Sequence, residues 1–372
     1  SVTVRTAPNI AVIKYWGKRD IPLNLPTNSS LSITLDSHDL ATTTTVTLRF
    51  SESAEDQDRF TLNGTPEIIP DRMKKVLSKW KRNHNSLPPH LRSSTPSTPS
   101  SPYYYFDVVS TNDKLPTAAG LASSSSGYSA LVFALSRLFD EPDSLENRIQ
   151  LTRLARMGSG SACRSLFGGF VLWNCGNDNG KNEIERDQDS FAEQLFPENH
   201  WPELQILICV VNSGRKAVSS SEGMQRTVHT SELYKSRLQN VPTRIDRMKR
   251  AILSHNFEEF SRIMMEDSDE MHACCEDSQP PIHYLNDTSR GLQQLVRDWN
   301  QLHHQAQVGY TFDAGPNCVL FTLTQHLPSF LQYFHQHCAI QSDSCQQQQQ
   351  PFTILSLIQT KMGAGPQVIS RN

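Results

Sequence analysis

One acidic side chain stands at a sharp turn near the end of the chain. Asp313 lies within residues 310–317 (Tyr-Thr-Phe-Asp-Ala-Gly-Pro-Asn), after an apolar segment and before the strand-like run 318–321. Gly315 and Pro316 favour a turn, because one tolerates positive φ and the other fixes φ. Two interpretations are open. Asp313 could form an Asx turn with nearby backbone N–H groups, or it could be a buried base that faces a polar substrate.

Three stretches place glycine and serine at the start of an expected helix, at residues 120–127, 158–165 and 218–223. A helix N-terminus offers unpaired N–H groups and partial positive charge, serine hydroxyls add donors, and glycine lets an anion approach the backbone. Ordinary N-capping explains a single serine but poorly explains the four consecutive serines 123–126. Three such stretches favour a ligand with several anionic groups, such as a nucleotide with a phosphorylated partner.

Cationic side chains occur within one of these stretches and in a separate cluster near the start of the sequence. If the second stretch is helical, Ser161 and Arg164 share a face, and Arg164 could bind a carboxylate or phosphate through two hydrogen bonds. Residues 14–20 (Lys-Tyr-Trp-Gly-Lys-Arg-Asp) mix cations with aromatic rings. They form either a solvated turn or a site where two lysines converge on phosphate while Tyr15 donates a hydrogen bond.

Composition and motifs exclude several other classes of protein. The 372 residues suffice for two or three domains, and the net charge of −3 gives no general attraction to nucleic acid or acidic membranes. No apolar run approaches the roughly 20 residues of a membrane span. Residues 176–182 have the wrong spacing for a P-loop, and no GxGxxG follows an expected strand. A phosphate-handling enzyme would therefore need a different nucleotide loop.

The cysteines and histidines give no sign of a disulfide framework or a metal centre. Eight cysteines occur without a CxxC pair, which favours free thiols in a reducing compartment and predicts a cytoplasmic protein. His335, His337 and Cys338, or the pair His303 and His304, could suggest a metal site. Neither group has a second ligand pair at suitable spacing, so solvated side chains are the preferred interpretation.

Hydrophobic periodicity predicts a chain of mixed helices and strands. Residues 71–84 place Met73, Val76, Leu77 and Trp80 on one helical face. We expect strands within 1–16, 31–50, 103–109, 170–173, 204–211 and 352–360, and helices at 71–84, from the serine run to about 139, at 145–157 and through much of 218–305. The polar segment 176–202 is the predicted domain junction. Residues 93–102 and the glutamine run 346–350 are low-complexity surface inserts.

Taken together, these residues resemble mevalonate diphosphate decarboxylases of the GHMP small-molecule kinase superfamily. Three pieces occur in the family's order and are specific to it. They are residues 14–18 (Lys-Tyr-Trp-Gly-Lys), 158–165 (Gly-Ser-Gly-Ser-Ala-Cys-Arg-Ser) and 312–317 (Phe-Asp-Ala-Gly-Pro-Asn). Matching segments at 7–11, 25–30, 116–124 and 218–224 extend the resemblance over most of the chain. The departures at 93–102, 176–190 and 346–350 fall between motifs, and 211–215 matches the family pattern only loosely.

The resemblance implies an α+β fold with two GHMP-kinase-like domains, 1–202 and 203–372, and an active-site cleft between them. It implies ATP-dependent decarboxylation of mevalonate 5-diphosphate, with Mg²⁺, to isopentenyl diphosphate, ADP, phosphate and carbon dioxide. A homodimer that binds neither nucleic acid nor membrane is expected.

The resemblance also assigns roles to individual residues, by their positions in this sequence. Asp313 and Lys14 would lie at the tertiary hydroxyl, Arg164 would hold the substrate carboxylate and Asn9 would help to fix the substrate. The substrate contacts would come from Tyr15, Trp16, Lys18, Ser159, Gly160, Ser161, Ser219, Ser220 and Met224. The ATP phosphates would lie on Pro116, Thr117, Ala118, Ala119, Gly120, Leu121, Ala122, Ser123 and Ser124. Mg²⁺ would be bound mainly through those phosphates, with Ser123 or Ser124 as side chains that could join it.

Two rival functions share these motifs. A kinase of the same superfamily would phosphorylate a related alcohol and stop there, without releasing carbon dioxide. A catalytically silent homologue would serve only as a binding or regulatory protein. The presence of Asp313, Lys14 and Arg164 argues against the silent homologue.

We predict that residues 93–102 are dispensable. Their composition of serine, threonine and proline cannot bury enough apolar surface to order the segment. Replacing them with a short Gly-Ser turn should leave turnover within about twofold of the unchanged chain, because surface inserts tolerate such changes. Steady-state kinetics with a melting curve checks this. A folded deletion variant with a large loss of activity would contradict it.

Overall fold

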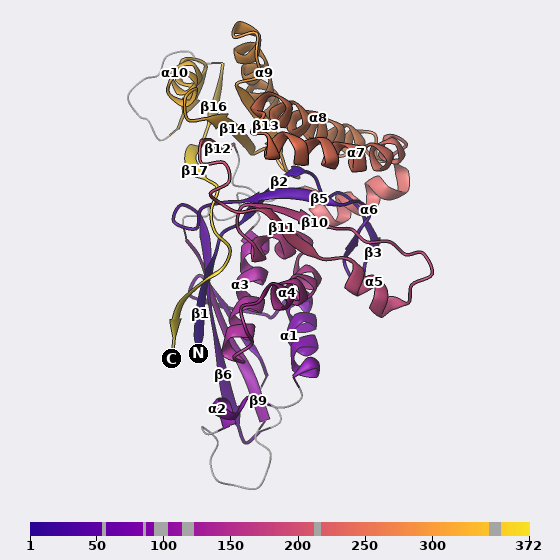
Figure 1. Cartoon of the computed structure of the whole chain (residues 1–372), viewed down its shortest axis with the longest axis vertical. Helices are drawn as coiled ribbons and strands as arrows, with labels where there is room; N and C mark the ends of the chain where they lie inside the picture. Colours follow the sequence, from indigo (N-terminus) through magenta and orange to yellow (C-terminus); the bar gives the residue numbers. More distant parts are fainter. Residues whose placement is uncertain (54–56, 85–86, 93–102, 114–122, 212–216, 342–350) are drawn as a thin grey trace.

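The computed structural model describes residues 1–53, 57–84, 87–92, 103–113, 123–211, 217–341 and 351–372. The molecule is elongated and has two parts (Figure 1). One part is built mainly from the first half of the chain and the other mainly from the second. A small sheet lies where they meet, and both termini lie side by side at the edge of the first part.

The first part contains a largely antiparallel sheet in the order β18-β1-β6-β9-β7-β8. Its strands are β1 (Val2–Thr6), β6 (Ala41–Ser51), β7 (Arg59–Leu62), β8 (Thr65–Glu67), β9 (Tyr103–Asp113) and β18 (Gln367–Arg371). Helix α3 (Ser123–Leu138) packs on β1 and β6, α4 (Leu145–Gly158) packs on α3, and α1 (Asp71–Asn83) packs on α4. The short helix α2 spans Pro89–Arg92.

The small sheet between the two parts has the order β11-β10-β5-β2. Its strands are β2 (Asn9–Ile13), β5 (Ser30–Thr34), β10 (Phe170–Trp173) and β11 (Ala192–Phe196). The hairpin of β3 (Lys18–Asp20) and β4 (Leu25–Pro26) lies between β2 and β5 in the chain. The 3₁₀ helix η1 (Gly160–Leu166) leads into β10, and α5 (Glu183–Asp189) precedes β11.

The second part has an antiparallel sheet in the order β13-β14-β12-β17, covered by helices. Its strands are β12 (Leu204–Val210), β13 (Val308–Phe312), β14 (Cys318–Leu323) and β17 (Ser356–Lys361), and β15 (Cys338–Ile340) pairs with β16 (Phe352–Ile354). The helices are α6 (Ser220–Thr230), α7 (Leu233–Leu253), α8 (Phe257–Glu276), α9 (Asp287–Leu302) and α10 (Leu327–His337). Helix α8 packs on α7, on β13 and on β2.

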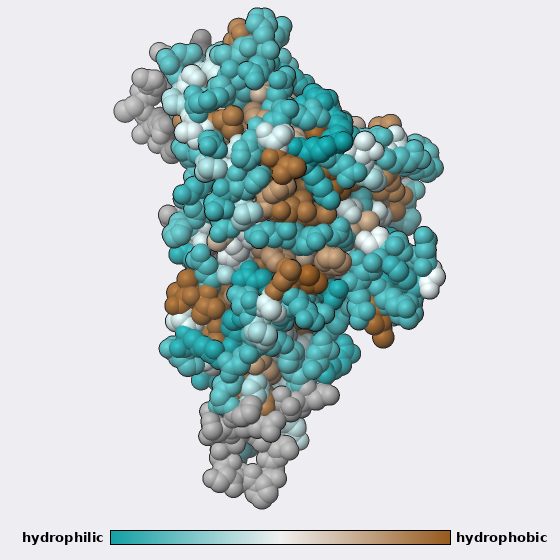
Figure 2. Space-filling view, in the orientation of Figure 1, coloured by the Kyte–Doolittle hydropathy of each residue, from teal (hydrophilic) through white to brown (hydrophobic). Residues whose placement is uncertain are grey.

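One hydrophobic core joins the two parts. Ile10 and Phe170 from the small sheet pack in the same buried cluster as Ile206, Met248 and Phe260 from the second part. Figure 2 shows a mostly hydrophilic surface on the viewed face, with hydrophobic side chains gathered near the middle, where the parts meet. Burial of the apolar side chains in the shared cluster fixes the two parts against each other. Side chains from both parts can therefore meet at set distances.

Most of the predicted elements are confirmed. The predicted face of α1 is buried as expected, and α3 and α4 begin and end close to the predicted positions. The polar segment 176–202, which we predicted as the domain junction, contains regular structure. It forms α5 and β11, and β11 pairs with β10. The sequence also gave no sign of β18, which pairs with β1 at the other end of the chain. The predicted inserts 93–102 and 346–350 lie outside the described residues.

Within the residues that the structure describes, no helix is both long and apolar enough to cross a bilayer.

An ionic contact links the end of α1 to the segment after α3. The Nε2 atom of His84 lies 2.8 Å from Glu141 Oε1. Burial is the largest single influence and lowers the pKa of His84, but the hydrogen bonds to Glu141 and to the Trp80 backbone, together with the charge of Glu141, leave that pKa above its usual 6.5. The pair's contribution to stability is therefore complete below the unfolded-state pKa and is lost as the pH rises through the folded-state pKa.

We predict that Glu141→Gln lowers the free energy of unfolding by about 0.5–1 kcal/mol more at about pH 5.5 than at about pH 8.5. Urea denaturation at both pH values measures the difference. In a His84→Gln background, which serves as the control, the Glu141→Gln substitution should cost the same at both pH values. A cost in the natural background that does not fall with rising pH would contradict the prediction.

Candidate active site

A cavity of about 550 Å³ opens between the two parts of the molecule. It gathers every site residue predicted from the sequence that the structure describes. These are Asn9, Lys14, Tyr15, Trp16, Lys18, Ser123, Ser124, Ser159, Gly160, Ser161, Arg164, Ser219, Ser220, Met224 and Asp313. The remaining predicted residues, 116–122, lie outside the described residues. The cavity lining comes from strand ends and helix starts far apart in the sequence.

An ion pair joins the two parts of the molecule across this cavity. Lys14 follows β2 and Asp313 follows β13, and Lys14 Nζ lies 2.7 Å from Asp313 Oδ1. The lysine side chain is 3% exposed and the aspartate side chain 43% exposed. Within the turn, the backbone carbonyl of Asp313 accepts a hydrogen bond from the Gly315 N–H group at 2.7 Å. The carboxylate therefore lies against a buried cation while remaining open to the cavity.

Arg164 is held in place by a buried hydrogen-bond network. Its Nε atom donates to Asn9 Oδ1 at 3.0 Å, and its Nη1 atom donates to Ser30 Oγ at 3.0 Å. Asn9 in turn donates to Ser165 Oγ and to the carbonyl of Ser161. Burial lowers the pKa of the Arg164 guanidinium, but arginine stays charged at ordinary pH. The network presents a fixed, planar cation at the cavity wall.

Donors for an anion gather beside Arg164. The Tyr15 hydroxyl is buried and has no hydrogen-bond partner among the described residues, and burial raises its pKa, so it keeps its proton. Burial and then the neighbouring Arg72 lower the pKa of Lys18, whose Nζ atom lies 3.4 Å from Ser221 Oγ. A Cβ atom at Gly160 would lie 2.8 Å from the Tyr15 ring, so glycine is required there.

Serines from all three serine-rich helix starts line the cavity, and two of the starts are in contact there. Ser124 Oγ, at the start of α3, lies 3.2 Å from Ser159 Oγ, just before η1. At the third start, Ser219 Oγ caps α6 by accepting from the Glu222 N–H group at 3.2 Å. Trp16 lines the cavity, but its Nε1 atom donates to Thr227 at 3.1 Å, which makes Trp16 a packing residue rather than a polar contact.

The structure adds two residues that sequence reasoning missed. Arg72, in the first turn of α1, lines the cavity and places a second cation near Lys18. His272 on α8 is 5% exposed, and burial followed by the charge of Lys14 lowers its pKa to about 3. His272 therefore stays neutral beside the Lys14–Asp313 pair at ordinary pH. Neither residue lies in a motif, so no local pattern could have identified it.

Among the described residues, no group of three or more histidine, cysteine or acidic side chains could hold a metal ion. Ser123 and Ser124 lie at the N-terminus of α3 and line the cavity. Helix N–H groups and hydroxyls suit phosphate oxygens. The start of α3 thus suits phosphate oxygens.

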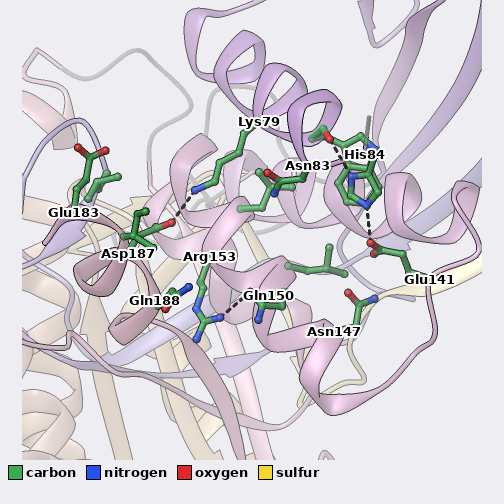
Figure 3. A pocket seen from close by; sticks show the side chains of 15 residues that line it. Lys79, Asn83, His84, Glu141, Asn147, Gln150, Arg153, Glu183, Asp187 and Gln188 are labelled. Carbon is green, nitrogen blue, oxygen red and sulfur yellow. Dashed lines mark hydrogen bonds and ion pairs between the residues drawn. The ribbon is translucent and has the colours of Figure 1, made fainter. Parts of the chain in front are cut away.

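A second cavity of about 550 Å³ lies between α1, α4 and α5 (Figure 3). Two of its basic side chains pair with carboxylates of the wall. Lys79 Nζ lies 2.7 Å from Asp187 Oδ2, His84 bonds Glu141, and Arg153 Nη1 donates to Gln150 at 2.7 Å. Because its lining holds as many acidic as basic side chains, this cavity lacks the surplus of cationic donors that the first cavity offers.

The two-part fold, with serine-rich helix starts around a central cavity, defines a member of the GHMP small-molecule kinase superfamily. Residues 6–192 match the family model of the diphosphomevalonate decarboxylase-like N-terminal domain. Residues 206–352 match the mevalonate 5-diphosphate decarboxylase C-terminal domain. The chain belongs to the diphosphomevalonate decarboxylase family.

Individual relatives agree with this assignment. The chain is 41% identical over its whole length to 99% of the diphosphomevalonate decarboxylase of Candida albicans. The solved mevalonate diphosphate decarboxylase from Trypanosoma brucei has a TM-score of 0.82 at 34% identity, covering 99% of this chain and 98% of that one. A further solved structure, at 33% identity and a TM-score of 0.78, is a complex with MVAPP, AMPPCP and magnesium, covering 100% of this chain and 99% of that one.

We predict that Arg164→Lys lowers kcat/KM for mevalonate 5-diphosphate roughly ten- to hundredfold although the charge is kept. A lysine ammonium cannot bond Asn9 and Ser30 while also gripping a carboxylate at two points. The KM for ATP should change little. Steady-state kinetics with each substrate varied in turn measures both effects.

Arg148→Lys is the matched control, because Arg148 makes two hydrogen bonds to Asp143 and one to the Leu166 carbonyl but does not line the cavity. The Arg148→Lys variant should lose stability at most and keep its kcat/KM. A folded Arg164→Lys variant with unchanged kinetics would rule out the carboxylate role.

Proposed function

We propose that this chain catalyses the ATP-dependent decarboxylation of mevalonate 5-diphosphate to isopentenyl diphosphate, ADP, phosphate and carbon dioxide, a step in the mevalonate route to isoprenoid and sterol precursors. The observation that carries the proposal is the 2.7 Å contact between Lys14 Nζ and Asp313 Oδ1 in the central cavity. A carboxylate beside a buried ammonium suits a reaction that takes a proton from an alcohol while negative charge moves between phosphate groups.

The substrate offers two anionic ends and a hydroxyl, and the cavity offers a partner for each. We assign Arg164, fixed by Asn9, to the substrate carboxylate, because a planar guanidinium matches it in two hydrogen bonds. The diphosphate goes to Tyr15, Lys18, Ser159, Gly160, Ser161 and the start of α6 at Ser219 and Ser220, with Met224 as an apolar wall. This leaves the tertiary hydroxyl to Lys14 and Asp313.

The ATP phosphates fit at the start of α3. Ser123 and Ser124 supply hydroxyls there, and Arg72 and Lys18 add cations across the cavity. We also assign residues 116–122, directly before them in the chain, to the ATP phosphates. Mg²⁺, held mainly by the phosphates with Ser123 or Ser124 as an added oxygen ligand, would neutralise charge during phosphoryl transfer.

The residue types suit the chemistry of a tertiary alcohol. Such an alcohol is a crowded, weak nucleophile, so Asp313 orients it and accepts its proton. Lys14 neutralises the charge that builds on the transferred phosphoryl group. Once the tertiary phosphate leaves, positive character develops beside the substrate carboxylate, and the negative charge of Asp313 favours it. Loss of carbon dioxide then supplies the electron pair for the new double bond.

Product analysis separates this function from its rivals. With mevalonate 5-diphosphate, ATP and Mg²⁺, the proposal expects equal amounts of ADP and carbon dioxide. A kinase that stops after phosphorylation would release ADP without carbon dioxide. A silent homologue would release neither. Either of those results would overturn the proposal.

The remaining expectations concern assembly and location. We propose a cytoplasmic homodimer that binds small molecules rather than nucleic acid. The described cysteines are all free thiols, which supports a reducing compartment. We also propose a domain boundary near residues 202 and 203. In that division β18 would cross the boundary, since it pairs with β1.

Asp313→Asn is predicted to lower kcat roughly a hundredfold to ten-thousandfold, the usual scale for a positioned acid–base group. Asparagine has nearly the same shape but neither accepts the proton nor favours the cationic transition state. Substrate affinity and melting temperature should change little. Because asparagine is an equally good Asx-turn residue, a turnover within about threefold of the natural chain would leave only the turn role.

A further inference from the structure

One turn of α8 holds the backbones on both sides of the Lys14–Asp313 pair. Asp267 Oδ2 accepts a hydrogen bond from the Lys14 N–H group at 2.7 Å. The next residue, Ser268, accepts through Oγ from the N–H group of Phe312, the neighbour of Asp313, at 3.0 Å. Asp267 and Ser268 are fully buried. Adjacent residues of one helix thus fix a strand end from each part of the molecule.

Asp267 is itself fixed by two arginines. Arg237 Nη1 lies 3.0 Å from Asp267 Oδ1, Arg237 Nη2 lies 3.1 Å from Oδ2, and Arg244 Nη1 lies 2.9 Å from Oδ1. Glu270 adds a second carboxylate to the same cluster through contacts with both arginines. A buried charge persists only where partners surround it, so this cluster holds the Asp267 carboxylate in one orientation.

The same cluster holds the other side of the Lys14 peptide. Arg237 Nη2 donates to the Lys14 carbonyl at 3.2 Å, and Asn28 Nδ2 donates to it at 2.9 Å. Both polar backbone groups of Lys14 are therefore bonded to fixed, buried side chains. The cluster determines where the Lys14 side chain starts, and hence where its ammonium meets Asp313.

We propose that Asp267 is a positioning residue for catalysis. Together with Ser268 it sets the Lys14 ammonium and the Asp313 carboxylate at the separation that the reaction needs. The inference rests on the proposed roles of Lys14 and Asp313. Displacing a reacting group by about 1 Å can cost on the order of a hundredfold in rate, so small shifts of either strand end should reach the chemistry without disturbing diphosphate binding.

Asp269 offers a matched control on the same helix. Its carboxylate accepts from the Tyr310 hydroxyl at 2.8 Å and pairs with Arg297 at 3.0 Å. It therefore ties α8 to the same strand, β13, without touching Lys14 or the neighbours of Asp313. Asp269→Asn removes the same charge as Asp267→Asn, so a loss that arises from general destabilisation should appear in both variants.

The first experiment measures kcat and KM for mevalonate 5-diphosphate, with melting curves. Asp267→Asn should lower kcat roughly ten- to hundredfold and leave KM within about threefold. Ser268→Ala, a smaller change that keeps the charge cluster, should lower kcat about fivefold through one lost hydrogen bond. Asp269→Asn should stay within about twofold of the natural kcat even where its melting temperature falls. The contacts of Asp269 do not include the backbone groups that position Lys14 and Asp313.

The second experiment repeats both substitutions in an Asp313→Asn background. Residues that act through one another give strongly non-additive effects. The cost of Asp267→Asn and of Ser268→Ala should therefore shrink to less than about twofold when Asp313 is already changed. The same cost in both backgrounds would overturn the positioning role. If Asp267→Asn does not fold, Ser268→Ala in the two backgrounds decides the matter.

The two proposals fail in different ways. If Asp313→Asn loses turnover while Asp267→Asn and Ser268→Ala keep it, the positioning role is wrong and the proposed catalytic pair stands. If Asp313→Asn itself keeps turnover, the proposed catalytic pair is wrong and the positioning role falls with it.

Discussion

The contact between Lys14 and Asp313 is the constraint on which the rest of the site depends. Its two members lie 299 positions apart in the chain, at the ends of strands from different sheets. A 2.7 Å contact between such distant groups requires that both parts of the molecule keep a fixed relation. The shared hydrophobic core around Ile10, Phe170 and Phe260 provides that relation through burial of apolar surface.

Hydrogen bonds and ion pairs then set the positions of individual side chains within the arrangement that the core fixes. Helix α8 belongs to the second part, yet it packs on β2 and bonds the backbone at Lys14. Asn9 and Ser30, from the small sheet, fix Arg164 in the same cavity. Lys14, Asp313 and Arg164 are each held by neighbours that are themselves buried. Such preorganisation lets the site favour developing charge without rearranging during the reaction.

Local sequence patterns predicted much of the fold, because local rules form its helices. The spacing of Met73, Val76, Leu77 and Trp80 specifies one face of α1, and that face is buried. The pairing of β18 with β1 could not be predicted, because it depends on the meeting of two chain ends rather than on any pattern within 367–371. Long-range pairing leaves little trace in a single sequence.

The residues of the candidate site likewise divide into those that the sequence identified and those that only the structure identified. The serine-rich starts and Lys14–Asp20 stood out through unusual composition, and the structure brings residues from each of these segments to one cavity. Arg72, Asp267 and His272 did not stand out, since each is one residue in an ordinary amphipathic helix. Their importance arises only from what the fold places beside them.

The most direct test of the proposed chemistry follows one oxygen atom. If the cavity activates the tertiary hydroxyl for phosphoryl transfer, that oxygen must leave the substrate within the released phosphate. Mevalonate 5-diphosphate labelled with oxygen-18 at the tertiary hydroxyl would be converted with ATP and Mg²⁺, and the inorganic phosphate analysed by mass spectrometry. The account predicts one labelled oxygen in each phosphate released. Unlabelled phosphate, with the label recovered in water, would contradict it.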